Sequence, residues 1–172
     1  MPIIGKQTMS ETEQALLDAV NTIGAKLRAK KEMLATAESC TGGWVGQVIT
    51  SIPGTSHWYD RGFITYSNVA KREMLGVPTD TLTRFGAVSE QTARAMAEGV
   101  LKNSQARHAL SITGIAGPEG GSPEKPVGYV CFAWAGYNRE TASECVRFDG
   151  DRQQVRIRAV QHSLERMAEF IT

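Results

Sequence analysis

The sequence has few cysteines and no apolar run long enough to cross a membrane. The three cysteines, Cys40, Cys131 and Cys145, are odd in number and lack the spacing of metal ligands, so neither a disulfide framework nor a cysteine metal centre is expected. No segment has the organisation of a signal peptide. These absences argue against a disulfide-rich secreted domain and a membrane-spanning protein, and the expected location is the cytoplasm.

An excess of charge of one sign is also lacking. The 172 residues include 19 basic and 18 acidic side chains, which are interspersed and give a formal net charge of +1. A protein that binds duplex DNA needs a concentrated basic face. The longest basic cluster, at 26–31, falls instead in the last turn of an expected helix, where cations complement the helix dipole. Nucleic acid is therefore not an expected partner.

What the sequence does have is a regular alternation of helix and strand patterns. Apolar residues make up 41% of the chain, and its length fits one domain with a substantial core. Helical and strand patterns alternate from residue 10 onward, and two strand-like segments joined by a short turn precede the last helix. This order predicts a single α/β domain over residues 10–172, a three-layer α/β/α sandwich with a mixed sheet, after a loose leader at 1–9.

Capping and stop signals set the expected boundaries of these elements. Ser10 opens the first helix with Glu13 three residues later, the arrangement of a capping box, and Ser89 caps a later helix. The segment 114–128 is too rich in glycine, proline and charge to be anything but a loop. Further helices are predicted at 42–52, 68–77, 78–85, 90–103 and 151–171, and strands at 33–37, 61–67, 108–113, 129–136 and 140–148.

Three polar loops follow predicted strands, at 38–43, 65–68 and 113–126. In an open α/β sheet, ligands bind at the carboxyl ends of the strands, where loops lead into helix N-termini. We therefore expect these three loops to share one rim of the sheet and to hold the residues that carry chemistry.

The first loop, "ESCTGG", crowds a carboxylate, a hydroxyl and a thiol beside two glycines. Ser39 or Thr41 could simply cap the following helix, with the glycines as a permissive turn. Alternatively, Gly42 and Gly43 let backbone N–H groups approach an anion at the helix start, and either Ser39 or Cys40 is a nucleophile. Successive side chains leaving a strand point in opposite directions, so Ser39 and Cys40 are not expected to face the substrate together. The loop matches neither a Walker A loop nor G-x-S-x-G.

The other loops add a possible base and anion-binding groups. Tyr66, Asn68 and Lys71 follow the second strand; Lys71 is either a surface lysine or a desolvated amine with a lowered pKa, which could serve as a base for a neighbouring hydroxyl. The glycines from Gly114 onward either form a flexible surface loop or wrap backbone amides around a phosphate or an oxyanion.

Two arginines, Arg152 and Arg156, stand four residues apart at the start of the last helix and so share one face. Guanidinium groups suit phosphate or carboxylate recognition, although the two side chains could equally be solvated.

Taken together, these segments resemble the CinA C-terminal domain family, the nicotinamide mononucleotide deamidases. The resemblance extends from about residue 10 to the end of the chain and is to the short, stand-alone form, so the pyrophosphatase activity associated with longer members is not expected. It is carried by "TAESCTGGWVGQVITSIPGTSHWYDRGFITYSNVAK" at 36–71, "GAVSE" at 86–90, "SITGIAGPEGGSPEKPVG" at 111–128 and "FDGDRQQVR" at 148–156.

The resemblance implies an α/β/α sandwich and hydrolysis of the carboxamide of nicotinamide mononucleotide (NMN) to nicotinate mononucleotide and ammonia, a step in pyridine-nucleotide salvage. It implies a metal-free and cofactor-free mechanism with Ser39 as the nucleophile, Lys71 as the general base and Tyr66 as an aid to proton transfer. Including the amides expected to hold the oxyanion, the substrate-binding residues are then Glu38, Thr41, Gly42, Gly43, Asn68, Thr113, Gly114, Arg152 and Arg156, of which Arg152, and secondarily Arg156, would meet the phosphate.

Two alternatives remain open from the sequence. Cys40 could be the nucleophile in place of Ser39, because a thiolate at a helix N-terminus is intrinsically reactive. The chain could also be a non-catalytic nucleotide-binding module, in which the glycine loops hold phosphate and Lys71 only neutralises charge. A homodimer is expected for a nucleotide enzyme of this size.

Overall fold

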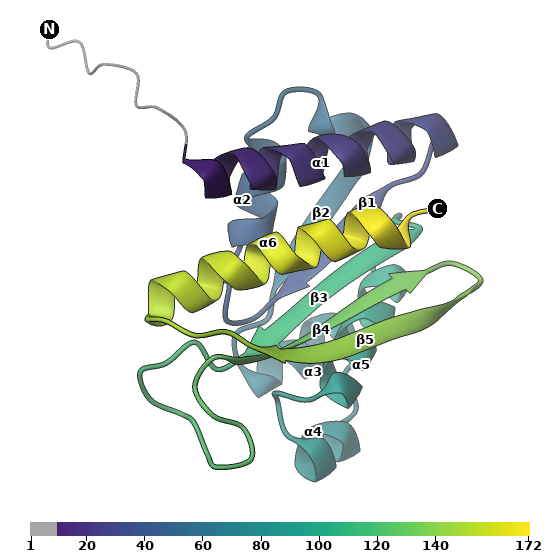
Figure 1. The fold of residues 1–172 in the computed structure, drawn as a ribbon. Coiled ribbons are helices and arrows are strands. Elements are labelled where there is room, and N and C mark those ends of the chain that lie inside the picture. Colours follow the sequence, from purple (N-terminus) through teal and green to yellow (C-terminus); the bar gives the residue numbers. More distant parts are fainter. Residues whose placement is uncertain (1–9) are drawn as a thin grey trace, which may run out of the picture.

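The computed structural model describes residues 10–172, so the leader predicted at 1–9 lies outside the described residues. Helices pack on both faces of one twisted sheet (Figure 1). Within the described range, no helix combines the length and low polarity needed to cross a bilayer. The elements are α1 (Glu11–Lys30), β1 (Leu34–Glu38), α2 (Trp44–Thr50), a 3-10 turn η1 (Thr55–His57), β2 (Tyr59–Ile64), α3 (Asn68–Leu75), α4 (Thr79–Phe85), α5 (Glu90–Lys102), β3 (His108–Gly114), β4 (Tyr129–Gly136), β5 (Arg139–Arg147) and α6 (Arg152–Phe170).

The sheet has the strand order β2-β1-β3-β4-β5. Strands β2, β1 and β3 are parallel, whereas β4 and β5 run antiparallel and form a hairpin. Tyr137 and Asn138 make the hairpin turn, in which Asn138 adopts a positive φ of 59°, a conformation that asparagine tolerates better than most residues. The predictions of a mixed sheet and of an α/β fold with helices on both faces are confirmed.

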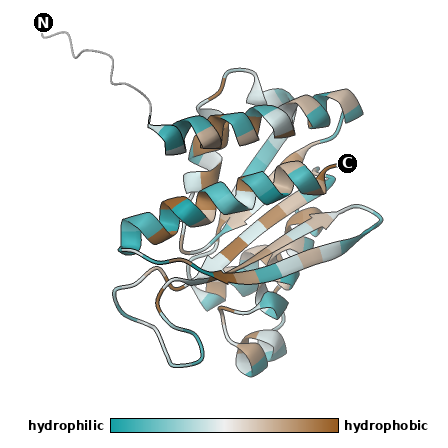
Figure 2. Cartoon of the chain, in the orientation of Figure 1, coloured by the Kyte–Doolittle hydropathy of each residue, from teal (hydrophilic) through white to brown (hydrophobic). Residues whose placement is uncertain are grey.

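Side chains of different size cover the two faces of the sheet. On β4, Val130, Phe132 and Trp134 face the layer formed by α1, α2 and α6. The alternate residues of the same strand, among them Ala133 and Ala135, face the layer of α5, with α3 and α4 beyond it. Such alternation is the period of two that a strand imposes on its side chains. Figure 2 shows the apolar residues concentrated in the central strands and the hydrophilic ones on the outer helical surfaces.

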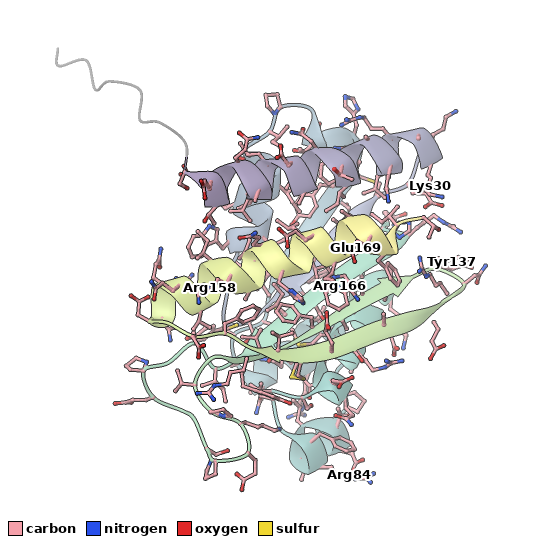
Figure 3. All side chains as sticks on the ribbon, viewed as in Figure 1. Lys30, Arg84, Tyr137, Arg158, Arg166 and Glu169 are labelled. Carbon is pink, nitrogen blue, oxygen red and sulfur yellow. A yellow bond between two sulfur atoms is a disulfide. The ribbon has the colours of Figure 1, made fainter. Side chains whose placement is uncertain are left out.

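The charged side chains lie mainly outside this core. Figure 3 shows the labelled Arg158, Arg166 and Glu169 on α6, and all three are exposed; Arg166 reaches from the helix to Glu144 on β5. The capping signals are confirmed: Ser10 and Glu13 form a capping box at the start of α1, and Ser89 caps α5. Both caps satisfy N–H groups that a helix start leaves without partners.

The expectation about cysteines is corrected in one respect. Cys131 and Cys145 lie opposite each other in the β4–β5 pairing and form a disulfide, with their Cα atoms 4.0 Å apart. The pairing register of the hairpin brings them together, and their spacing along the chain of 14 residues carries no sign of it. Cys40 is free and buried.

Candidate active site

Residues from all three polar loops line one cavity at the carboxyl ends of β1, β2 and β3. The cavity has a volume of about 270 Å³ and is also bounded by the first turn of α6. Figure 1 shows that the start of α6 and the long loop after β3 lie at the same end of the molecule. The residues that line the cavity are Ser39, Cys40, Tyr66, Asn68, Lys71, Ala87, Val88, Thr113, Gly114, Ala116 and Arg152.

Ser39 and Lys71 meet at the floor of this cavity. Lys71 Nζ donates to Ser39 Oγ at 3.1 Å and to the carbonyl oxygen of Thr65 at 2.9 Å. The side chain of Lys71 is 1% exposed, and within residues 10–172 it forms no ion pair with a carboxylate. Burial disfavours the charged form of an amine and lowers the pKa of Lys71 below its ordinary value.

The start of α3 sets the position of Lys71. The side chain of Ser67 accepts a hydrogen bond from the N–H of Ala70 at 3.0 Å and so caps the helix. Lys71 then falls in the first turns of α3 and is buried. The cap also explains why β2 ends at Ile64 rather than at 67 as predicted: the chain must leave the sheet to begin the helix.

Glu38 holds the loop that follows β1. Its carboxylate, 2% exposed, accepts hydrogen bonds from the N–H groups of Gly43 at 3.1 Å, Val45 at 3.1 Å and Gly46 at 3.0 Å. Glu38 was expected to orient or bind the substrate; here it binds the amides of its own chain and does not line this cavity.

The capping reading of "ESCTGG" is therefore wrong for Ser39 and Thr41. The N-cap residue of α2 is Gly43, in a left-handed conformation with φ 99°, and no side chain at that position caps the helix. Because Glu38 accepts the N–H groups at the start of α2, Ser39 Oγ is not needed as a cap and contacts Lys71.

Two of the amides expected to hold an oxyanion are occupied. The N–H of Gly42 donates to the carbonyl oxygen of Ser39 at 3.1 Å, and the N–H of Gly43 donates to Glu38. Within the part of the chain that the structure describes, the N–H groups of Cys40 and Thr41 donate to no other residue. Of the three amides expected to hold the oxyanion, those of Thr41, Gly42 and Gly43, folding of the loop thus uses the last two and leaves that of Thr41.

The expected substrate-binding residues divide between two hollows. Asn68, Thr113, Gly114 and Arg152 line the cavity with Ser39 and Lys71. The remaining residues of that set, apart from Glu38, line a neighbouring hollow of about 380 Å³, and they are Thr41, Gly42, Gly43 and Arg156.

The two arginines make different contacts. Arg152 donates to the carbonyl oxygen of Gly117 at 2.8 Å and to Tyr66 Oη at 3.3 Å, at the mouth of the cavity. Arg156 donates to the carbonyl oxygens of Cys40 at 3.0 Å and Thr41 at 3.1 Å. Although four residues separate them on one helix, only Arg152 lines the cavity.

Cys40 lines the cavity together with Ser39, contrary to the expectation that only one of them faces it. Burial raises the pKa of the Cys40 thiol to about 11, and this position therefore disfavours the thiolate that a cysteine nucleophile needs. Ser39 is the residue whose side chain hydrogen-bonds the buried amine.

Sequence reasoning missed several contributors. Thr65 holds Lys71 through its backbone carbonyl, which every residue type possesses, so no sequence signal marks it. Ala87 and Val88 form part of the cavity wall, and Ala87 also accepts the Thr113 hydroxyl at 2.7 Å through its carbonyl oxygen. Within residues 10–172, no group of three or more histidine, cysteine, aspartate or glutamate side chains is arranged to hold a metal ion.

These features define a class: a three-layer α/β domain with a serine–lysine pair buried at the carboxyl ends of its parallel strands. The chain belongs to the CinA C-terminal domain family, which matches residues 17–171. The family resemblance indicated by the sequence is confirmed.

Relatives in this family cover most of the chain. The nicotinamide-nucleotide amidohydrolase PncC of Escherichia coli strain K12 is 51% identical over 156 residues, which cover 90% of this chain and 93% of that protein. The protein of the same name from Pseudomonas putida is 42% identical over 91% of this chain and 99% of its own. The crystal structure of the competence/damage inducible protein CihA from Agrobacterium tumefaciens is similar with a TM-score of 0.88 and 42% identity, covering 98% of this chain and 100% of that one.

Proposed function

We propose that this protein is a nicotinamide-nucleotide amidohydrolase that converts NMN and water into nicotinate mononucleotide and ammonia. Membership of the family and the similarity to proteins of that name support the reaction. The observation that carries the mechanism is the hydrogen bond between Ser39 Oγ and a buried Lys71 amine that has no carboxylate partner in the described chain.

In the first half of the reaction, the neutral amine of Lys71 takes the proton of Ser39 as Oγ bonds to the carboxamide carbon. A serine hydroxyl is a weak nucleophile without such a base, and the positive ring nitrogen of the substrate withdraws electrons and aids the attack. The carbonyl electron pair moves onto oxygen. When the tetrahedral intermediate collapses, the C–N bond breaks and the Lys71 ammonium returns a proton to the departing nitrogen, which leaves as ammonia.

In the second half, water attacks the ester on Ser39. Lys71 again accepts the proton, and the serine oxygen regains it as the nicotinate product leaves. A base that works twice near neutral pH should have a pKa closer to the working pH than that of a free lysine, and burial moves the pKa of Lys71 in this direction.

The oxyanion requires hydrogen-bond donors beside Ser39. The N–H groups of Cys40 and Thr41 are suitable, since they lie directly after the nucleophile and donate to no other residue within residues 10–172. Donors aimed at the developing charge are among the largest contributions to such reactions.

The cavity mouth provides groups for the rest of the nucleotide. Arg152 stands there beside Tyr66, and a guanidinium group is well suited to a phosphate. Asn68, Thr113 and Gly114 also line the cavity, where they would contact the ribose or the ring. Tyr66 would assist proton transfer, and its phenol also hydrogen-bonds Arg152.

Purified protein with NMN tests this function. Ammonia and nicotinate mononucleotide should appear together, at the same rate with and without a chelator. Binding of NMN without ammonia release would favour a non-catalytic nucleotide-binding module, and release abolished by the chelator would indicate a metal-dependent hydrolase. A cytoplasmic location, where pyridine nucleotides are recycled, is part of the same proposal.

A further inference from the structure

Arg156 binds the loop that carries the proposed nucleophile, and it lines the neighbouring hollow rather than the cavity that holds Lys71. Its Nε donates to the carbonyl oxygen of Cys40 at 3.0 Å and its Nη2 to that of Thr41 at 3.1 Å. The guanidinium carbon also lies 5.1 Å from the centre of the Trp44 ring, a distance typical of cation–π contact. The half-buried side chain of Arg156 therefore contacts three residues of one short segment, Cys40, Thr41 and Trp44.

That segment is a β-turn. The N–H of Gly42 donates to the carbonyl oxygen of Ser39 at 3.1 Å, which closes a four-residue turn with Cys40 and Thr41 at its centre. A flip of the central peptide would require a positive φ at Thr41, which is costly for a β-branched residue. Thr41 is not among the residues with positive φ, so the turn is in the unflipped form.

The carbonyls that Arg156 binds determine where the neighbouring N–H groups point. In a trans peptide the C=O and N–H groups point in opposite directions. Holding the Cys40 carbonyl therefore directs the N–H of Thr41 to the other side of the turn. The Thr41 carbonyl accepts both the guanidinium of Arg156 and the N–H of Trp44, each at 3.1 Å, and this directs the N–H of Gly42 toward Ser39. The Gly42–Ser39 bond in turn orients the peptide that bears the N–H of Cys40.

We propose that Arg156 is a positioning residue: by binding the two carbonyls on one side of the turn, it fixes the N–H groups of Cys40 and Thr41 as the oxyanion donors on the other. This inference rests on the proposed function and assigns Arg156 a different role from Arg152. Arg152 lines the substrate cavity, whereas Arg156 does not. Loss of Arg156 should accordingly affect the chemical step rather than nucleotide binding.

The test compares Arg156→Ala and Arg156→Lys with Arg158→Ala, which removes an exposed arginine two residues along the same helix. For each protein, kcat and KM are measured with NMN, and the Kd of nicotinate mononucleotide is measured by calorimetry. Removing one oxyanion donor costs about 100- to 1,000-fold in kcat, so Arg156→Ala, which loosens the donors without deleting them, should lower kcat by roughly 10- to 100-fold. KM and Kd should change less than about threefold, and Arg158→Ala should match the wild type.

Rescue experiments separate positioning from a general loss of structure. Arg156→Lys, which can bind one carbonyl, should retain an intermediate kcat, and millimolar guanidinium ion should restore part of the activity of Arg156→Ala. An unchanged kcat in Arg156→Ala, or a raised KM and Kd with kcat unaltered, would overturn the inference. If Arg156→Ala does not fold, the kcat of Arg156→Lys is used instead. A reduced kcat then supports the proposal, and a kcat equal to that of the wild type overturns it. An inactive wild-type protein would instead refute the proposed function itself, and the inference with it.

Discussion

At the scale of the residue, the site depends on a buried amine without a compensating negative charge. Lys71 is 1% exposed, and its hydrogen-bond partners are a hydroxyl and a carbonyl oxygen, both neutral. A charged ammonium is costly in such surroundings. In the proposed mechanism, the same burial that destabilises the charged lysine suits Lys71 to act as the base for Ser39.

The pH dependence of turnover should report this amine. In the proposed mechanism the neutral form of Lys71 is the active one, so kcat should rise with pH through the pKa of Lys71. Because burial lowers that pKa, the rising limb should lie below the value of about 10.4 found for a free lysine. A pH–rate profile checks this, and a limb at or above that value would contradict the role of Lys71 as base.

Lys71 should also reduce stability at neutral pH. Its pKa is lower in the folded state, so between the folded and unfolded pKa values the unfolded chain binds more protons, and the stability of the wild type rises with pH across that window. A Lys71→Met variant lacks this contribution. The free energy of unfolding of Lys71→Met minus that of the wild type should therefore be largest near neutral pH and should decline toward pH 10.

Urea unfolding of both proteins at several pH values measures this difference. Other titrating groups cancel because they are common to both chains. A difference that stays constant or grows with pH would show that the amine has no lowered pKa in the folded protein.

At the scale of the element, most of the fold follows from local patterns. The capping box at Ser10 and the cap at Ser89 depend on residues three positions apart, and such short-range signals are visible in a sequence. The three-layer arrangement could be predicted for the same reason, because the alternation of helix and strand patterns is also local. The site's three loops were also identifiable, because polar segments after strands gather at one end of a parallel sheet.

The sequence predictions fail where a side chain contacts residues distant in the sequence, or where it makes a hydrogen bond that a nearer residue was expected to make. Glu38 caps α2 from the preceding strand, five to eight positions ahead of the amides it binds, so the usual search for a cap at the helix start selects Ser39 or Thr41. The disulfide depends on strand register, and Arg156 on the approach of α6 to the loop. None of these follows from spacing along the chain.

Replacing Glu38 tests its role in holding α2. Glutamine at this position keeps one oxygen but exchanges the other for an NH₂ group, which faces N–H donors rather than acceptors. Since a buried donor left without a partner costs about 1–3 kcal/mol, Glu38→Gln should lower the free energy of unfolding by roughly 2–4 kcal/mol. Denaturant unfolding measures the loss.

Glu73→Gln is the matched control, because Glu73 is exposed on α3. Its stability should stay within about 0.5 kcal/mol of the wild type. Equal stabilities for the Glu38 and Glu73 variants would show that the three hydrogen bonds of Glu38 do not anchor the helix.

At the scale of the whole molecule, the outer strand β2 and the start of α3 present apolar side chains beside the cavity. Ile64 is 52% exposed, Tyr66 64% and Val69 55%. Exposed apolar groups gathered in one region favour contact with another protein surface, and the homodimer expected from the sequence remains a prediction that would use this region.

Light scattering after size-exclusion chromatography checks the assembly. The wild type should have twice the mass of the 18.7 kDa chain, and Val69→Glu should shift it toward the monomer. Arg84→Glu, at an exposed position on α4, should leave the mass unchanged. A monomeric wild type at micromolar concentration would contradict the prediction.

The most direct measurement of the central claim is ammonia release from NMN by Ser39→Ala and Cys40→Ala side by side with the wild type. Loss of a nucleophile typically costs several orders of magnitude in turnover, so the serine variant should fall by about 1,000-fold or more. Cys40→Ala, which keeps its backbone N–H and loses only a buried thiol, should retain most of the activity. The reverse pattern, an active Ser39→Ala and an inactive Cys40→Ala, would contradict the account.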